Sequence, residues 1–261
     1  ILGKIYVGQA YVNGEAQTGT VSHKILGGLD ISDKTFYHDW SQTFTLPDLD
    51  IYNPVHGIAA SPKFDRSKDI KDRGVEYYNN YKGFYLQDEL GFLDNSLRLT
   101  LAGRYTILKA GNVYSGSSTN EKFTPRIGLS YSIDKNTSAY FVRDESFTEN
   151  YGSDFNKNSF DPQTGTNLEL GFKRDWMNGK WNSTIAAYQI TLNNVLTADP
   201  EHAQFSRQSG QQKVKGVEVD IRGEIFKNFD VVANYAFTEG TTTKDTNPDL
   251  VGNQVPGSSR H

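Results

Sequence analysis

Residues 216–222 read Gly-Val-Glu-Val-Asp-Ile-Arg and alternate apolar with charged side chains. Successive side chains of a β-strand point to opposite faces. One face of this strand is therefore apolar, and the other carries Glu218, Asp220 and Arg222. Because one face is strongly apolar and the other is charged, the central question about the fold is which solvent each face contacts.

The same alternation recurs along the chain, and no segment carries a sustained helical period. Leu97, Leu99 and Leu101, for example, alternate with Arg98 and Thr100. The pattern predicts roughly ten strands, at about 5–12, 18–31, 77–93, 96–109, 122–133, 137–149, 167–177, 180–196, 206–226 and 229–238. The 24 glycines, 15 tyrosines and 15 phenylalanines among the 261 residues fit an all-β chain rich in turns.

The connections between these strands differ in length. Four tight hairpin turns are predicted at 94–95, 134–136, 178–179 and 227–228, where Asn, Asp and Gly tolerate positive φ. Longer polar stretches lie at about 39–76, 110–121, 150–166, 197–212 and from 239 onward. Short turns at one end and long loops at the other are typical of an up-and-down antiparallel sheet.

Composition excludes several classes of protein. Hydrophobic residues make up 36% and mean hydropathy is −0.60. No run of about twenty apolar residues exists, so a transmembrane helix is excluded, whereas a barrel strand needs apolar residues only at alternate positions. The chain contains no cysteine, so disulfides and thiolate metal sites are impossible. A net charge of −4 without a basic run argues against a nucleic-acid partner.

Alternation alone is compatible with a soluble β-sandwich, such as a carbohydrate-binding module, and with a transmembrane barrel. The sorting of loop lengths favours the barrel. Aromatic residues near strand ends also favour it, because they suit the interfacial girdles of a barrel. They are Phe92, Tyr105, Tyr131, Phe147, Trp176, Trp181, Phe226 and Phe229.

A third possibility is a small outer-membrane enzyme barrel, which requires converging His, Asp and Ser residues. His38-Asp39 is the nearest approach, but adjacent residues of an extended chain point apart and no nucleophile motif accompanies them. The five histidines show no metal-ligand spacing. We therefore expect neither enzymatic activity nor a protein metal site.

A set of sequence blocks, in the same order along the chain, resembles the barrel of TonB-dependent siderophore receptors, particularly the ferrichrome-type branch. The ordered set is more specific than any single block. The blocks are HKILGGLD at 23–30, IYNPV at 51–55, GFYLQD at 83–88, LAGRY at 101–105, FTPRIGLSY at 123–131, SF at 146–147, DPQTGTNLELGFK at 161–173, AYQITLNNVLT at 187–197, GVEVD at 216–220 and NYAFT at 234–238.

The resemblance implies a barrel of about twenty-two strands in the bacterial outer membrane, with an N-terminal plug in its lumen. It implies import of a ferric siderophore, energised through the TonB complex, with iron present only as the bound chelate and no further cofactor. The plug, its TonB-binding segment and the closing strands are unmatched. We therefore expect residues 1–261 to be one partial barrel domain of a longer protein.

The resemblance also implies roles for particular residues. Charges on one strand face would line the hydrated lumen, namely Arg98, Arg104, Arg126, Glu169, Lys173, Glu218, Asp220 and Arg222. Aromatic residues in the outer loops are expected to contact the siderophore. These residues are Tyr37, Trp40, Tyr114, Tyr151 and Phe155.

Overall fold

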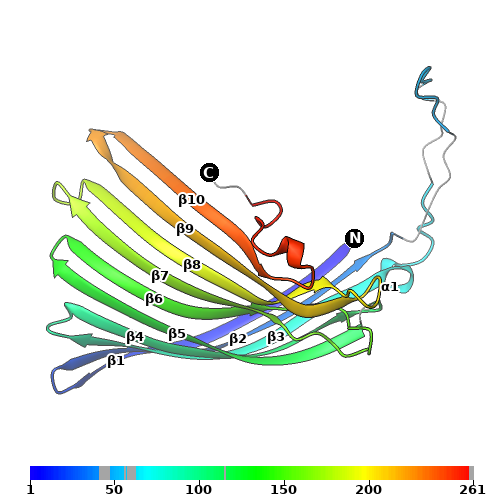
Figure 1. The fold of residues 1–261 in the computed structure, drawn as a ribbon. Helices are drawn as coiled ribbons and strands as arrows, with labels where there is room; N and C mark the ends of the chain where they lie inside the picture. The colour runs from blue at the N-terminus through cyan, green and yellow to red at the C-terminus, as the bar shows by residue number, and fades with distance from the viewer. Residues whose placement is uncertain (41–47, 56, 58–62, 115, 259–261) are drawn as a thin grey trace.

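The computed structural model describes residues 1–40, 48–55, 57, 63–114 and 116–258. These residues form one ten-stranded antiparallel sheet in which each strand pairs with the next along the chain (Figure 1). The strands are β1 (Leu2–Thr18), β2 (Val21–His38), β3 (Val75–Phe92), β4 (Leu97–Asn112), β5 (Gly116–Asp134), β6 (Thr137–Thr148), β7 (Gln163–Trp176), β8 (Trp181–Ala198), β9 (Ser206–Phe226) and β10 (Phe229–Lys244). The predicted up-and-down antiparallel fold is confirmed.

All four predicted tight turns are present. They join β3 to β4, β5 to β6, β7 to β8 and β9 to β10, and positive φ angles occur at Asn95, Asn178 and Asn228. Asn and Gly adopt this left-handed backbone at low cost, which is why the turns were visible in the sequence. A one-turn helix, α1 (Ile70–Arg73), and a 3₁₀ turn, η1 (Pro248–Leu250), complete the described elements.

Two connections differ from the prediction. β1 does not end at Val12 but continues to a two-residue turn at Gly19, where φ is +60°. The predicted loop 110–121 is mostly strand, since β4 and β5 stay paired from Ala110↔Ser118 to Asn112↔Gly116. Small polar residues read as loop by composition, but the backbone of 116–121 pairs with β4 regardless of side chain.

The pairing register divides the side chains of the sheet into two faces. We call the face that carries Thr100 the inner face and the face that carries Leu99 the outer face. The sheet bends into a trough, and the C-terminal tail lies inside it (Figure 1). Gly240 belongs to the inner face by register, and its Cα faces Val255 of the tail. The inner face is therefore the concave one.

The outer face is apolar and exposed. Leu86 and Leu170 are both 62% exposed, and Phe84 is 53% exposed. Two ion pairs interrupt this surface: His23 with Asp88 at 2.7 Å, and Arg143 with Glu145 at 2.6 Å. Pairing lowers the cost of an ionisable group in apolar surroundings. Among the described residues, no helix is long and apolar enough to cross a membrane.

The inner face contains three tyrosines that each lie over a directly paired glycine of the neighbouring strand. The pairs are Tyr85 over Gly28, Tyr140 over Gly171 and Tyr188 over Gly216. A side chain at any of these glycines would collide with the ring. Each hydroxyl then makes a hydrogen bond beyond the glycine, with Gln9, Glu169 and Thr238 respectively.

Buried apolar side chains are few in the described part of the chain, among them Leu108, Ala110, Phe160 and Pro162. A β-sandwich buries one face of each of two sheets against the other. Here a single sheet leaves its apolar face uncovered, so the soluble sandwich is not favoured.

Candidate ligand-binding surface

All eight predicted lumen charges share the inner face by register. Arg104 is the best anchored of them, because its guanidinium donates two hydrogen bonds of 2.7 Å to the carboxylate of Asp30. The contact crosses Gly83 of the intervening strand, where a side chain would collide with the guanidinium. The guanidinium carbon also lies 5.7 Å from the ring centre of Tyr81. A bidentate pair of this kind fixes the orientation of the arginine.

Further contacts tie the inner-face charges together. Arg126 donates to Asp144 at 2.9 Å, and Glu169 accepts from the Tyr140 hydroxyl at 2.6 Å. The ammonium of Lys173 lies 5.1 Å from the centre of the Tyr140 ring. Arg104, Arg126, Glu169 and Lys173 of the inner wall therefore each have a polar, charged or aromatic partner, as expected of a hydrated but partly enclosed surface.

An aromatic cluster lies on the inner face, where β2 ends and β3 begins. Phe36 and Tyr77 are directly paired, and their rings stack with centroids 5.0 Å apart. The ring of His38 lies 4.9 Å from that of Tyr77 and 4.2 Å from that of Trp40. His38 is buried, whereas Trp40 is 76% exposed at the edge of the cluster. An exposed indole on a fixed aromatic base is suited to contact a ligand.

A hollow of about 320 Å³ lies on the inner face, next to this cluster along β3. Tyr81 and Arg104 lie among its strand residues, and Glu149 and Tyr151 are contributed by the loop after β6. One member of each predicted group, Arg104 of the lumen charges and Tyr151 of the loop aromatics, thus lines the same hollow. Its full lining is Asn79, Tyr81, Arg104, Thr106, Leu108, Phe147, Thr148, Glu149 and Tyr151.

Glu149 is the unusual residue of this hollow. One carboxylate oxygen accepts a 2.5 Å hydrogen bond from the Ser118 hydroxyl. The other, Oε2, is shielded from solvent and has no hydrogen-bond partner. Burial raises the pKa of Glu149, although the Ser118 hydroxyl and the Asn120 amide, which lies beside the carboxylate and donates to Ser118 at 3.4 Å, act in the opposite direction. A buried acceptor without a donor carries a free-energy cost that a suitable ligand can relieve.

The loop that contains Phe155 docks onto the loop between β8 and β9. The Phe155 ring stacks on His202 with centroids 3.5 Å apart and meets Phe205 edge-on at 5.3 Å. At the base of the loops, the Asp161 backbone N–H donates to Gln208, and the Gln208 amide donates to the Asp161 carbonyl. Phe155 therefore joins two outer loops.

Asp199 anchors the second of these loops. Burial alone would raise the pKa of Asp199, but hydrogen bonds from the Glu201 backbone, His202 and Arg207 together lower it to about 2. Asp199, Glu201 and His202 bring metal-ligand atoms within 4.8 Å of one another. Arg207 bonds to both carboxylates, at 3.1 Å and 2.7 Å, so the arrangement is an ion-pair cluster.

Of the other predicted aromatics, Tyr37 and Tyr114 lie apart from the hollow. Tyr37 lies on the outer face, paired with Leu2 and Glu76. Tyr114 is 74% exposed in the connection between β4 and β5, where its N–H donates to Asn112. Tyr151 lines the hollow and Trp40 borders the neighbouring cluster.

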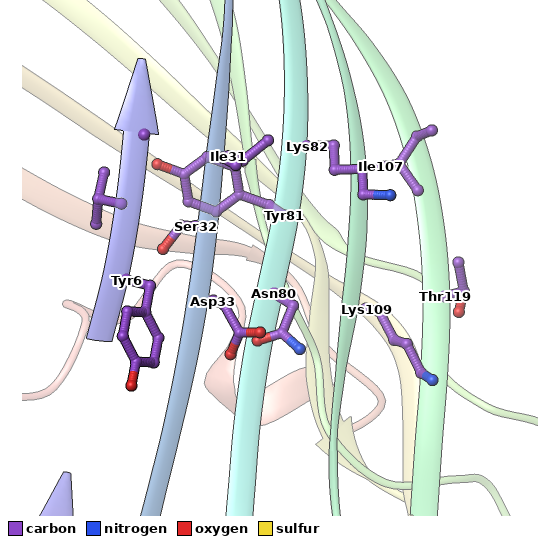
Figure 2. A pocket seen from close by; sticks show the side chains of 12 residues that line it. Tyr6, Ile31, Ser32, Asp33, Asn80, Tyr81, Lys82, Ile107, Lys109 and Thr119 are labelled. Atoms are coloured by element: carbon purple, nitrogen blue, oxygen red, sulfur yellow. The ribbon is translucent and has the colours of Figure 1, made fainter. Parts of the chain in front are cut away.

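A further hollow, of about 600 Å³, lies across β1 to β5. Figure 2 shows side chains of β1 to β5 that line it, among them Tyr6, Ile31, Asp33, Lys82 and Lys109. These five residues belong to the outer face by register. Ser32 and Tyr81 of the inner face also line this groove, so it shares Tyr81 with the hollow described above.

Sequence reasoning missed Tyr81, Tyr77 and Glu149 as members of this surface. The two tyrosines lie within the segment predicted as strand 77–93, in inner-face register with Tyr85. Extending the alternation from Tyr85 through Gly83 would have found them. Glu149 had no such signal, because its environment depends on Ser118 of another strand.

A model of the TonB-dependent receptor-like β-barrel family matches residues 4–261. The metal-pseudopaline receptor of Pseudomonas aeruginosa strain UCBPP-PA14 is 29% identical over 250 residues, which cover 90% of this chain and 34% of that protein. The ferrichrome outer membrane transporter/phage receptor of Escherichia coli K12 is 30% identical over 242 residues, covering 88% of this chain and 31% of that protein.

Among solved structures, the ferric preacinetobactin receptor of Acinetobacter baumannii superposes with a TM-score of 0.83 at 20% identity, covering 99% of this chain and 39% of that one. That similarity concerns the fold. The chain spans about a third of the length of the curated relatives it matches.

Proposed function

Because the chain belongs to the TonB-dependent receptor-like β-barrel family, we propose that the intact protein imports a ferric siderophore across the outer membrane with energy supplied through TonB. The family match over residues 4–261, on a sheet with one apolar and one charged face, carries this proposal. The protein is accordingly a bacterial outer-membrane protein. Its relatives are transport receptors, and we propose no enzymatic activity for it.

The two faces suit this function. The exposed leucines and phenylalanines of the outer face would contact lipid, where apolar groups are favoured. The inner-face charges would line a hydrated interior and pair with the plug of the intact protein. Arg98, Glu218, Asp220 and Arg222 are available for this role, because no ion pair within 4.0 Å involves them among the described residues.

The ligand-binding surface would lie on the inner face, at the end of the sheet that carries the long loops. A ferric siderophore arrives with its iron already chelated, so the receptor supplies a concave aromatic and polar surface rather than metal ligands. The cluster at Trp40 and the hollow at Tyr81, Arg104 and Tyr151 provide such a surface. Tyr114 and Phe155 lie in loops and stay in the proposed contact set, whereas Tyr37 lies in β2 on the outer face, away from this surface.

Uptake of radiolabelled iron tests the proposal. The intact protein would be expressed in a Gram-negative host that lacks its own siderophore receptors, and ferrichrome, ferrioxamine B and ferric pyoverdine would each be supplied with ⁵⁵Fe. We expect uptake of at least one chelate, and loss of that uptake in a matched host without TonB. Absence of uptake for every chelate from correctly inserted protein would contradict the proposal.

A further inference from the structure

The hollow at Tyr81 and Arg104 contains one charge that is not compensated. Of its nine lining residues only Arg104 and Glu149 are charged, and Arg104 is neutralised by its two hydrogen bonds with Asp30. In the described part of the chain, no lysine or arginine forms an ion pair with Glu149 within 4.0 Å. Lys122 lies on the same face of β5, four residues from Ser118, and is likewise in no ion pair among these residues. The carboxylate is therefore the hollow's unmatched charge.

The position of the carboxylate also suits a donor group. The Ser118 hydroxyl holds one oxygen at 2.5 Å and itself accepts from the Asn120 amide at 3.4 Å, which leaves Oε2 without a donor at hydrogen-bond geometry. Glu149 belongs to the lining of the hollow, so a ligand bound there would lie beside this carboxylate. A ligand N–H placed there would satisfy an acceptor that the protein leaves without a partner.

We propose that this hollow recognises a positively charged amine on the ferric chelate, with Glu149 as the residue that selects for it. The inference rests on the proposed siderophore uptake and specifies its substrate class. A protonated amine supplies both features that Glu149 lacks, a positive charge and an N–H donor. A neutral amide supplies only the donor, and an anionic group near Glu149 is repelled.

The pKa of Glu149 supports the same conclusion. Burial disfavours the charged form of this carboxyl and raises its pKa. An ammonium group beside it would act in the opposite direction and favour the carboxylate. The ligand would thus supply the missing partner of a prearranged acceptor, which is how buried polar groups generate specificity.

Binding of two matched probes to the intact protein in outer-membrane vesicles tests this inference. Ferrioxamine B carries a primary ammonium group, and its N-acetyl derivative has the same ferric hydroxamate core without that charge. We expect the wild-type protein to bind the ammonium form about tenfold more tightly or better, the range of a hydrogen bond to a charged group. In Glu149→Gln the ratio of the two affinities should fall to about one.

Glu121→Gln is the matched control, because Glu121 lies on the same strand as Ser118 but on the outer face, where it accepts from Tyr105. It should keep the wild-type ratio. Since each ratio is taken within one variant, it does not depend on how much protein folds. Equal binding of both probes by wild-type protein, binding of neither, or an unchanged ratio in Glu149→Gln would overturn the inference. Uptake of any ferric chelate in the preceding experiment would leave the proposed function standing.

Discussion

At the scale of single residues, Leu99 and Thr100 are neighbours in the chain but meet different surroundings. Leu99 lies between Leu90 and Leu129 on the outer face, and Thr100 lies between Glu89 and Gly128 on the inner face. The strand period of two residues makes this difference unavoidable. A charge introduced at each position therefore reports on the solvent of each face.

Leu99→Arg should destabilise the membrane-inserted protein by roughly 2–4 kcal/mol, because it places a cation against lipid hydrocarbon. Thr100→Arg should cost much less, since its side chain meets a hydrated surface with Glu89 beside it. Urea unfolding of the intact protein in lipid vesicles gives both free energies of unfolding. Equal costs for the two variants would show that the assignment of the faces is wrong.

Asp199 provides a pH-dependent prediction at the same scale. Its folded-state pKa is lowered to about 2, below the ordinary value of 3.8, so its stabilising contacts with His202 and Arg207 are complete above about pH 4. They are lost as the pH falls through about 2. Hydrogen exchange of the loop amides at 199–205, corrected for intrinsic rates, should accelerate over this interval.

Asp199→Asn is the control for that experiment, because an amide does not titrate. Its loop should already exchange rapidly at pH 5, and the corrected rate should change little down to pH 2. If the wild-type loop had already lost its protection before the pH fell to 4, another acidic group would have to be responsible.

At the scale of the strands, the tyrosine-over-glycine contacts hold neighbouring strands in register on the inner face. The ring covers a glycine of the neighbouring strand, and its hydroxyl bonds to a side chain past that glycine, as Tyr140 does to Glu169 on the same strand as Gly171. Large aromatic rings over strand glycines replace packing that glycine cannot supply. The glycine is required at this position because of the close approach of the ring.

Gly171→Ala should therefore destabilise the protein by about 1–3 kcal/mol, since the added methyl group collides with the Tyr140 ring. Gly128→Ala is the matched control on the inner face of β5, where the nearest atom would lie at 3.4 Å, an ordinary contact. Chemical unfolding of both variants in vesicles measures the difference. Comparable free energies of unfolding would mean that the ring moves aside without cost.

At the scale of the whole molecule, the sheet is a curved wall with a lipid side and a water side. The three tryptophans of the chain sample different parts of it. Trp176 and Trp181 are paired on the outer face beside the turn at Asn178, and Trp40 lies in the aromatic cluster at the opposite end. Paired tryptophans at a strand end are typical of the membrane interface.

Variants of the intact protein that keep one of these tryptophans, with the other two replaced by Phe, should respond to different quenchers. Lipids brominated near the headgroup should quench Trp176 and Trp181 strongly and Trp40 little. Aqueous iodide should give the reverse order, because Trp40 is 76% exposed. Lipid quenching of Trp40 to the level of Trp181 would contradict the proposed orientation of the wall.

Alternation and turn chemistry act over a few residues, so the number of strands, four of the tight turns and the faces of the charged residues could be read from the chain alone. Arg98, Glu169 and Asp220 share a face for that reason. The fold set which residues meet across strands. It joined Arg104 to Asp30, placed Phe155 on His202 and put Glu149 beside Ser118 with one oxygen unpaired. Such contacts depend on register and loop docking between segments distant in the chain, and no local pattern encodes them.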